Sequence, residues 1–335
     1  MRRVRVLLAI CALTGLAAGP SPAHLGSGDD VAPRDTVSTV QSVTPSLPAG
    51  VKVDVVGGDT FLRLRASGHT VAVAGYEGEP YLRVSPDGTV EENVSSPTSF
   101  VNASRFGGTV PSMADTGENW QRTATDGTVM WHDHRIHWMS PSRPAVIDTD
   151  GTVLRWEVPL SVDGTVHTVR GTLYLRERAS ALWWAAGLAG LALAALLALS
   201  RRRAYLLAVA GVGAWSTVTG VLQWLSLPSG ARITPLLAVF GAGAFIAGVA
   251  AVAVARRGDR RSDWVASSLA AGAGTAMLVV TWMTWTQVRS AYVPMLGPVW
   301  TARANVAVLL GFGLVAVIDG VMRVMRVEPL PSDAE

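Results

Sequence analysis

Short stretches of alternating apolar and polar residues, separated by turns, run from Val51 to Arg176. A period of two is typical of strands that bury one face against a core. We therefore expect residues 24–179 to form an all-β antiparallel sandwich of the cupredoxin-like or immunoglobulin-like kind. The predicted strands are Thr36–Val43, Val51–Val55, Phe61–Leu64, Thr70–Val73, Tyr81–Val84, Thr128–Trp138, Thr152–Leu160 and Thr165–Leu175.

The tetrapeptide Asp-Gly-Thr-Val occurs four times in this region, starting at Asp87, Asp126, Asp150 and Asp163. Asp-Gly suits the positive φ angles of a tight hairpin turn, and Thr-Val favours the start of a strand. The unequal intervals argue against a solenoid repeat. Residues 93–120 lack this periodicity and are rich in glycine and proline, so we expect a long irregular loop there.

Five apolar segments follow, each about as long as the twenty residues that cross a bilayer. We place them at 181–199, 204–226, 233–255, 264–286 and 304–325. We therefore expect an all-α, five-span transmembrane domain over 180–326, whose partner is the lipid bilayer, and a tail over 327–335. Nine arginines fall on one side of these segments and three on the other. The positive-inside rule then predicts a multi-pass plasma-membrane protein with an extracytoplasmic β domain and a cytoplasmic C-terminus.

Residues 1–23 have the pattern of a signal peptide, with three arginines, the apolar run Val6–Ala18 and small residues near Ala23. Cleavage after Ala23 would make His24 the mature N-terminus. The alternative is an uncleaved anchor, although the apolar run is short for a span. The single cysteine, Cys11, lies within this segment, so the mature chain would have no disulfide.

The charge distribution argues against a nucleic-acid partner despite a pI near 9.4. Residues 24–180 carry 13 basic and 19 acidic side chains, whereas 12 basic and 6 acidic side chains follow residue 180. The excess of positive charge therefore lies between the apolar segments, where it sets membrane topology. The sequence also contains no GxSxG, no HExxH and no glycine-rich phosphate loop, so it does not support an ordinary hydrolase or nucleotide enzyme.

Three of the six histidines fall within six positions, in the segment Trp131–Met139. In a strand, His132 and His134 would project to one face about 7 Å apart, and His137 would point to the other face unless a bulge re-aimed it. Two imidazoles suit Cu(II), Zn(II) or Ni(II). The α-amine and imidazole of His24 are further candidate ligands.

The alternative to a metal site is that the same segment has a purely structural role. Trp131, Ile136 and Trp138 have the character of core residues, and a histidine among them can hydrogen-bond to the backbone. Glu77 and Glu79 likewise suit an acid/base pair, a site for a hard cation or a solvated acidic turn. In the last apolar segment, Asp319 is spaced to pair with Arg323 one helical turn away.

A mature N-terminal histidine followed downstream by Trp-His-x-His resembles the copper site in the cupredoxin-like domain of particulate methane monooxygenase. The matching positions are His24, His132 and His134, with Trp131 before the pair. An N-terminal histidine exposed by signal cleavage is also similar to that of the CopC family of copper carriers, whose partners are multi-span membrane proteins. The single lysine among many arginines is typical of membrane proteins from high-GC bacteria.

These observations predict a membrane-anchored protein that binds and handles copper, with zinc as a second candidate, and that delivers the metal to or through the membrane. Its partners would be copper-handling membrane or envelope proteins. The alternative is a metal-free envelope module that binds a protein partner through the sandwich and the 93–120 loop. A copper oxidase is a third, less favoured hypothesis, because no motif assigns a reaction.

Overall fold

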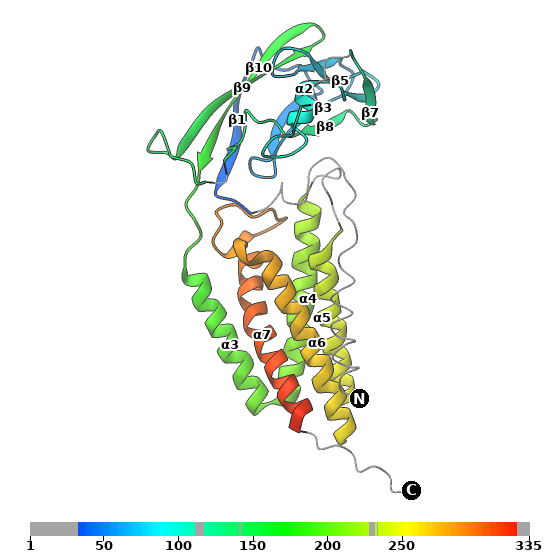
Figure 1. Ribbon diagram of the computed structural model, residues 1–335, viewed down its shortest axis with the longest axis vertical. Helices are drawn as coiled ribbons and strands as arrows, with labels where there is room; N and C mark the ends of the chain where they lie inside the picture. Colours follow the sequence, from blue (N-terminus) through cyan, green and yellow to red (C-terminus); the bar gives the residue numbers. More distant parts are fainter. Residues whose placement is uncertain (1–32, 111–116, 141, 228–231, 233, 327–335) are drawn as a thin grey trace.

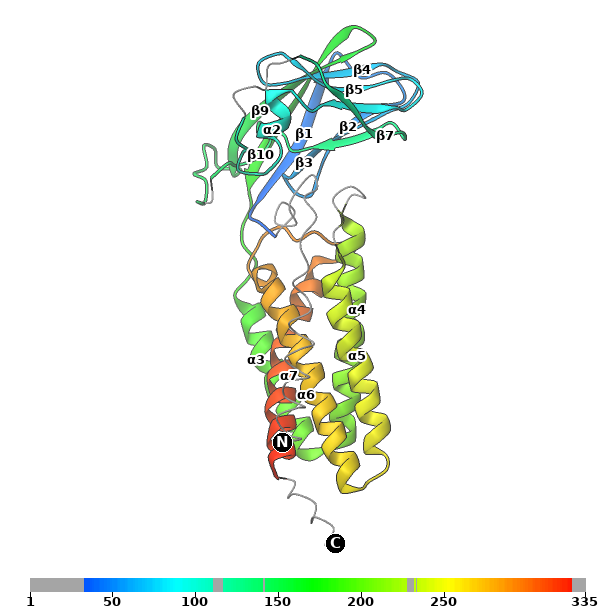
Figure 2. The ribbon, with the colours of Figure 1, turned by 45° about the vertical axis from the view of Figure 1, so that its right-hand side comes forward.

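The computed structural model describes residues 33–110, 117–140, 142–227, 232 and 234–326. A β domain stands at one end of a bundle of long helices, as Figures 1 and 2 show. The predicted signal peptide, His24 and the tail over 327–335 lie outside the described residues. An antiparallel β domain followed by five apolar helices is the fold class that the sequence predicts, and it is confirmed.

Two antiparallel sheets form the β domain. One has the strand order β1-β10-β9-β4-β5-β6-β7, and the other has the order β2-β3-β8. The strands are β1 (Thr36–Thr44), β2 (Val51–Val56), β3 (Phe61–Ala66), β4 (Val71–Ala74), β5 (Pro80–Val84), β6 (Val90–Asn93), β7 (Trp120–Ala124), β8 (Thr128–Trp131), β9 (Thr152–Val162) and β10 (Thr165–Leu175).

The core of the β domain is built from alternating positions of both sheets. Leu62 and Leu64 of β3 and Val71 of β4 are fully buried, and Val73 of β4 is almost fully buried. Val158 of the long strand β9 is also fully buried. Side chains two apart along a strand share one face, so the period of two in the sequence directly produces this shared apolar layer.

All four Asp-Gly-Thr-Val sequences precede strands, as predicted, but the predicted hairpin is present at two of them: Asp87-Gly88 joins the paired strands β5 and β6, and Asp163-Gly164 joins the paired strands β9 and β10. Asp126-Gly127 instead connects strands of different sheets, and Asp150-Gly151 follows a loop. The four glycines have φ angles of 85° at Gly88, 68° at Gly127, 88° at Gly151 and 82° at Gly164. At Gly127 an added Cβ would lie 2.1 Å from the main-chain oxygen of Ala66, so glycine is required there for space as well as for conformation.

Among the described residues, five helices are long and apolar enough to cross a membrane. They are α3 (Leu182–Ser200), α4 (Arg202–Ser226), α5 (Leu236–Ala255), α6 (Arg260–Thr284), which continues as the short 3-10 helix η3 (Trp285–Val288), and α7 (Val299–Arg326). The segments at 181–199 and 204–226 begin within two residues of α3 and α4, while α6 and α7 begin four and five residues earlier than predicted. Their lengths and composition place the chain among multi-pass membrane proteins.

Helices α4 and α5 lie side by side in both views (Figures 1 and 2) and approach closely through glycines. A Cβ added at Gly213 would lie 2.4 Å from the backbone nitrogen of Phe245, and one at Gly241 would lie 2.6 Å from that of Thr217. Small residues permit this backbone contact, which is a common means of packing helices in lipid.

The β domain is joined to the loop between η3 and α7 through residues next to β1. Arg34 and Tyr292 exchange both main-chain hydrogen bonds, at 3.1 Å and 2.8 Å. Asp35 pairs with Arg178 and also accepts the backbone N–H of Ala291. These contacts attach the β domain to the bundle at a point other than the covalent link into α3.

Within the described residues, an ion-pair cluster and a pair of amides lie inside the helical bundle. The predicted pair of Asp319 and Arg323 is present, and Asp319 also binds Arg202 at the start of α4. Near the opposite end of the bundle, the buried side-chain amides of Gln223 and Gln287 hydrogen-bond to each other. Both arrangements pair polar groups that lipid would leave unsatisfied.

Two sequence predictions for the β domain differ from the structure. The strand predicted over Thr128–Trp138 ends at Trp131. The loop predicted over 93–120 contains the short helix α2 (Pro97–Val101) and ends at the start of β7. The N-cap Ser96 and the following proline start this helix, a combination that suits a helix N-terminus.

Candidate metal centre

The chain turns after Trp131, at the end of β8, because Asp133 hydrogen-bonds to neighbouring residues of the same segment. Its carboxylate is fully buried. The carboxylate accepts hydrogen bonds from the indole of Trp131 and from the backbone and guanidinium of Arg135, and the main-chain carbonyl of Asp133 accepts the N–H of Ile136. These local bonds outcompete continuation of the strand ladder. Ile136 then enters the core with no exposed surface.

The turn brings three histidine rings together. The ring centroids of His132 and His137 are 5.2 Å apart, those of His134 and His137 are 5.1 Å apart, and those of His132 and His134 are 6.5 Å apart. Imidazole nitrogens about 2.0–2.1 Å from one metal ion place ring centroids at roughly 4.5–6.5 Å from each other. The three separations fall within this range, although centroid distances do not fix the directions of the ring nitrogens.

Main-chain carbonyl oxygens fix the protonated nitrogen of two of these rings. Nε2 of His134 lies 3.0 Å from the carbonyl oxygen of Ser104, and Nδ1 of His137 lies 3.4 Å from that of Trp138. Because a carbonyl only accepts, each of these nitrogens is the donor, and the second nitrogen of each ring carries the lone pair. A histidine ligand typically donates its other N–H in this way.

Nε2 of His137 is buried and has no hydrogen-bond partner among the described residues. A buried nitrogen lone pair without a donor is unusual, since buried polar atoms are normally satisfied. His137 itself is only 1% exposed and His132 is 3% exposed, whereas His134 is half-buried. The cluster is thus a nitrogen-rich site largely closed to water.

The environment keeps two of the rings uncharged near neutral pH. Burial lowers the pKa of His137 to about 3, with further lowering by His132 and His134. Burial and the nearby His132 also lower the pKa of His134, against the opposing effect of its bond to Ser104. Neutral imidazole is the form that binds metal ions, so no proton would have to be displaced from these two rings at neutral pH.

Three other elements surround the cluster. The ring of Phe61, at the start of β3, lies 5.0 Å from that of His132. The hydroxyl of Tyr76 accepts the backbone N–H of His134 and donates to the side chain of Asn102, just after α2. The segment that follows α2 therefore covers the histidines and holds them in place.

A buried ion-pair network stands beside the histidines. Asp59 is fully buried and binds Arg105 through both carboxylate oxygens, at 3.0 Å and 2.8 Å. It also accepts from Arg34 and from the hydroxyl of Thr36. Burial raises the pKa of Asp59 to about 6, although Arg34, Thr36 and His132 lower it. These hydrogen bonds to Arg34, Thr36 and Arg105 favour a structural role for Asp59.

The structure changes the expected arrangement of the candidate histidines. A continuous strand would place His137 on the opposite face from the pair, but the turn brings its ring between those of His132 and His134. The expectation that this pair shares one strand face is wrong, because neither residue lies in a strand. In this conformation no group of three His, Cys, Asp or Glu within the described ranges has its donor atoms converged on one point. The rings are nevertheless adjacent, so convergence requires side-chain rotation.

The remaining histidines of the described chain lie elsewhere. His69 binds Asp163 and the carbonyl oxygen of Ala49, and His167 contacts the carbonyl oxygen of Pro45. Both have the partners of structural histidines. Glu79, the other titratable candidate, accepts hydrogen bonds from Ser96 and Thr98 and thereby anchors α2. Glu79 is therefore not part of a freely solvated turn, and its acid/base role with Glu77 stays a prediction.

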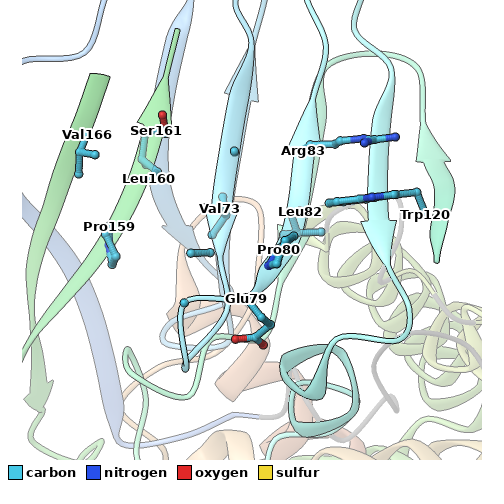
Figure 3. A pocket seen from close by; sticks show the side chains of 13 residues that line it. Val73, Glu79, Pro80, Leu82, Arg83, Trp120, Pro159, Leu160, Ser161 and Val166 are labelled. Carbon is cyan, nitrogen blue, oxygen red and sulfur yellow. The ribbon is translucent and has the colours of Figure 1, made fainter. Parts of the chain in front are cut away.

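An apolar depression of about 330 Å³ lies on the β domain, away from the histidines. Figure 3 shows it between β9 and β10 on one side and β5 and β7 on the other. The guanidinium of Arg83 stacks on Trp120, 4.1 Å from the ring centroid, at one wall, and the exposed Val166 stands at the other. It contains no histidine and has little polar chemistry.

No protein family, no curated protein and no solved structure matches this chain.

Proposed function

We propose that this protein binds copper at the extracytoplasmic face of a membrane, through His132, His134 and His137, and hands it to or through the membrane domain. The observation that carries the proposal is the contact of three imidazole rings at 5.1–6.5 Å. An all-nitrogen ligand set suits Cu(II) best among the common divalent ions, with Zn(II) next. A free amine at His24 would supply a further nitrogen ligand.

Metal content of the purified full chain in detergent tests this proposal. After equilibrium dialysis against Cu(II) or Zn(II), the wild type is expected to retain one ion per chain. The double variant His132→Ala/His134→Ala should retain none. His69→Ala is the matched control, because it removes a histidine of the same domain outside the cluster, and it should bind like the wild type. Equal retention by all three proteins would overturn the proposal.

In the proposed orientation, the β domain lies outside a plasma membrane. The C-terminal ends of α3, α5 and α7 lie on its cytoplasmic side. Arginines at the α3–α4 and α5–α6 turns support this orientation. The single native cysteine, Cys11, lies in the predicted signal peptide, so one introduced cysteine reports its own location. A membrane-impermeant maleimide applied to intact cells should label Ser161→Cys and should leave Arg257→Cys unlabelled. The reverse pattern would contradict the orientation.

A metal-free module that binds a protein partner is the second candidate function. The apolar depression beside Arg83 and Trp120 supports it, because an aromatic ring with a stacked guanidinium is common in protein interfaces. This candidate function predicts that Trp120→Ala abolishes binding of the protein partner. The His132→Ala/His134→Ala variant should still bind it.

A further inference from the structure

A second concavity, of about 280 Å³, lies at the base of the β domain, next to the helical bundle. Its walls come from the residues leading into β1, from the segment after α2 and from the segment after Trp138. Four arginines line it: Arg34, Arg105, Arg143 and Arg178.

Positive charge exceeds negative charge in this cavity. Asp59 compensates Arg34 and Arg105 together, and Asp35 compensates Arg178. Arg143 is exposed and has no carboxylate partner in the part of the chain that the structure describes. The positive charges of four guanidinium groups are thus balanced by the negative charges of only two carboxylates. The β domain carries more acidic than basic residues from 24 to 180, so this concentration of arginine does not follow from composition.

Neutral hydrogen-bonding groups complete the lining. Ser140 and Ser142 face the cavity and hydrogen-bond to each other through their hydroxyls, at 2.7 Å. Guanidinium and hydroxyl donors together are the groups that recognise phosphate oxygens. Phe106, which also lines the cavity, is 61% exposed and adds an apolar surface.

The cavity lies close to the start of the apolar helix α3 and to the loop between η3 and α7. Arg178 precedes the lipid-spanning helix α3 by four residues, and Leu182 at the start of that helix is 75% exposed. Arg34, the neighbour of Asp35, is bound through its backbone to Tyr292 in the loop between η3 and α7. A phosphate group in the cavity would therefore be within reach of a lipid whose acyl chains lie against α3.

We propose that this cavity binds a phosphate ester, with Arg143 as its principal charged ligand and Arg178, Ser140 and Ser142 as additional donors. The headgroup of an anionic phospholipid and a soluble phosphate ester share this chemistry. The proposal does not depend on metal binding at the histidines, because none of the three histidines lines the cavity.

Two binding measurements on the full chain in detergent distinguish the sources. Native mass spectrometry compares retention of phosphatidylglycerol with that of phosphatidylcholine, and isothermal titration measures binding of glycerol 3-phosphate. The test variant is Arg143→Glu, at an exposed position whose change leaves the buried ion pairs intact. Arg122→Glu is the matched control, since it reverses an exposed arginine of the same domain on β7, outside the cavity.

A preference for phosphatidylglycerol that falls at least about tenfold in Arg143→Glu, and is kept in Arg122→Glu, would identify a lipid headgroup site. A similar loss for glycerol 3-phosphate alone would identify a site for a soluble ester. Arg143→Lys should keep most of the binding, because it keeps the charge. If the two charge-reversal variants behave alike in both measurements, the proposal is wrong.

Discussion

Nε2 of His134 lies 3.0 Å from the carbonyl oxygen of Ser104, thirty positions earlier in the chain. This contact ties the ring to the segment that follows α2, and the same segment sends Arg105 to Asp59. The orientation of the histidine cluster is therefore set by a distant part of the chain as well as by its own turn. Changes in this supporting structure should affect the site without touching a histidine.

Asp59→Asn is expected to destabilise the β domain by about 3–5 kcal/mol, because it removes the charge that compensates two largely buried arginines. In a domain of this size, the melting temperature should fall by roughly 10 °C. Tryptophan fluorescence during heating of the detergent-solubilised protein measures the change. Asp148→Asn breaks an exposed pair with Arg155 and should have little effect. Equal melting temperatures for the two variants would show that the buried network contributes little.

Glu79 predicts a specific dependence of stability on pH. Burial raises the pKa of this carboxylate, but hydrogen bonds from Thr98, Ser96 and the backbone outweigh burial and lower it to about 2. As the pH falls, Glu79 therefore binds a proton at a higher pH in the unfolded chain than in the folded chain. Its stabilisation is therefore complete above the unfolded pKa of about 4.5 and is lost as the pH falls toward 2.

Glu79→Gln should accordingly cost about 1 kcal/mol at pH 7, after allowance for solvent screening of this partly exposed group. The difference in unfolding free energy from the wild type should shrink as the pH falls from 5 to 3. Denaturant titrations at several pH values measure it. A difference that stays constant over this range would mean that the ionised form of Glu79 does not hold α2.

The strands and spans could be predicted from the sequence because each depends on local periodicity. The turn after Trp131 could not, since it results from buried bonds of Asp133 to Trp131 and Arg135. A strand pattern continues through these residues, so periodicity alone separates His137 from the other two histidines. The pairing of Asp319 with Arg202 could not be predicted from the sequence either, because 117 positions separate the two residues and only the tertiary structure brings them together.

The glycine contact between α4 and α5 can be tested with a matched pair of substitutions. Gly213→Val would force its side chain into the backbone of Phe245 and should lower stability by about 1–3 kcal/mol. Gly211→Val lies on the same helix, two positions away, where an added Cβ meets nothing within 4 Å. Thermal unfolding in detergent should separate the two variants. Equal losses would indicate that helix propensity, rather than packing, sets the effect.

The number of imidazoles bound to copper tests the central claim most directly. X-ray absorption at the copper edge on the loaded full chain should show imidazole scattering from His132, His134 and His137 at about 2.0 Å. In His137→Ala the same signal should correspond to one fewer imidazole. A spectrum without imidazole scattering, or one unchanged in His132→Ala/His134→Ala/His137→Ala, would contradict a copper site in this turn.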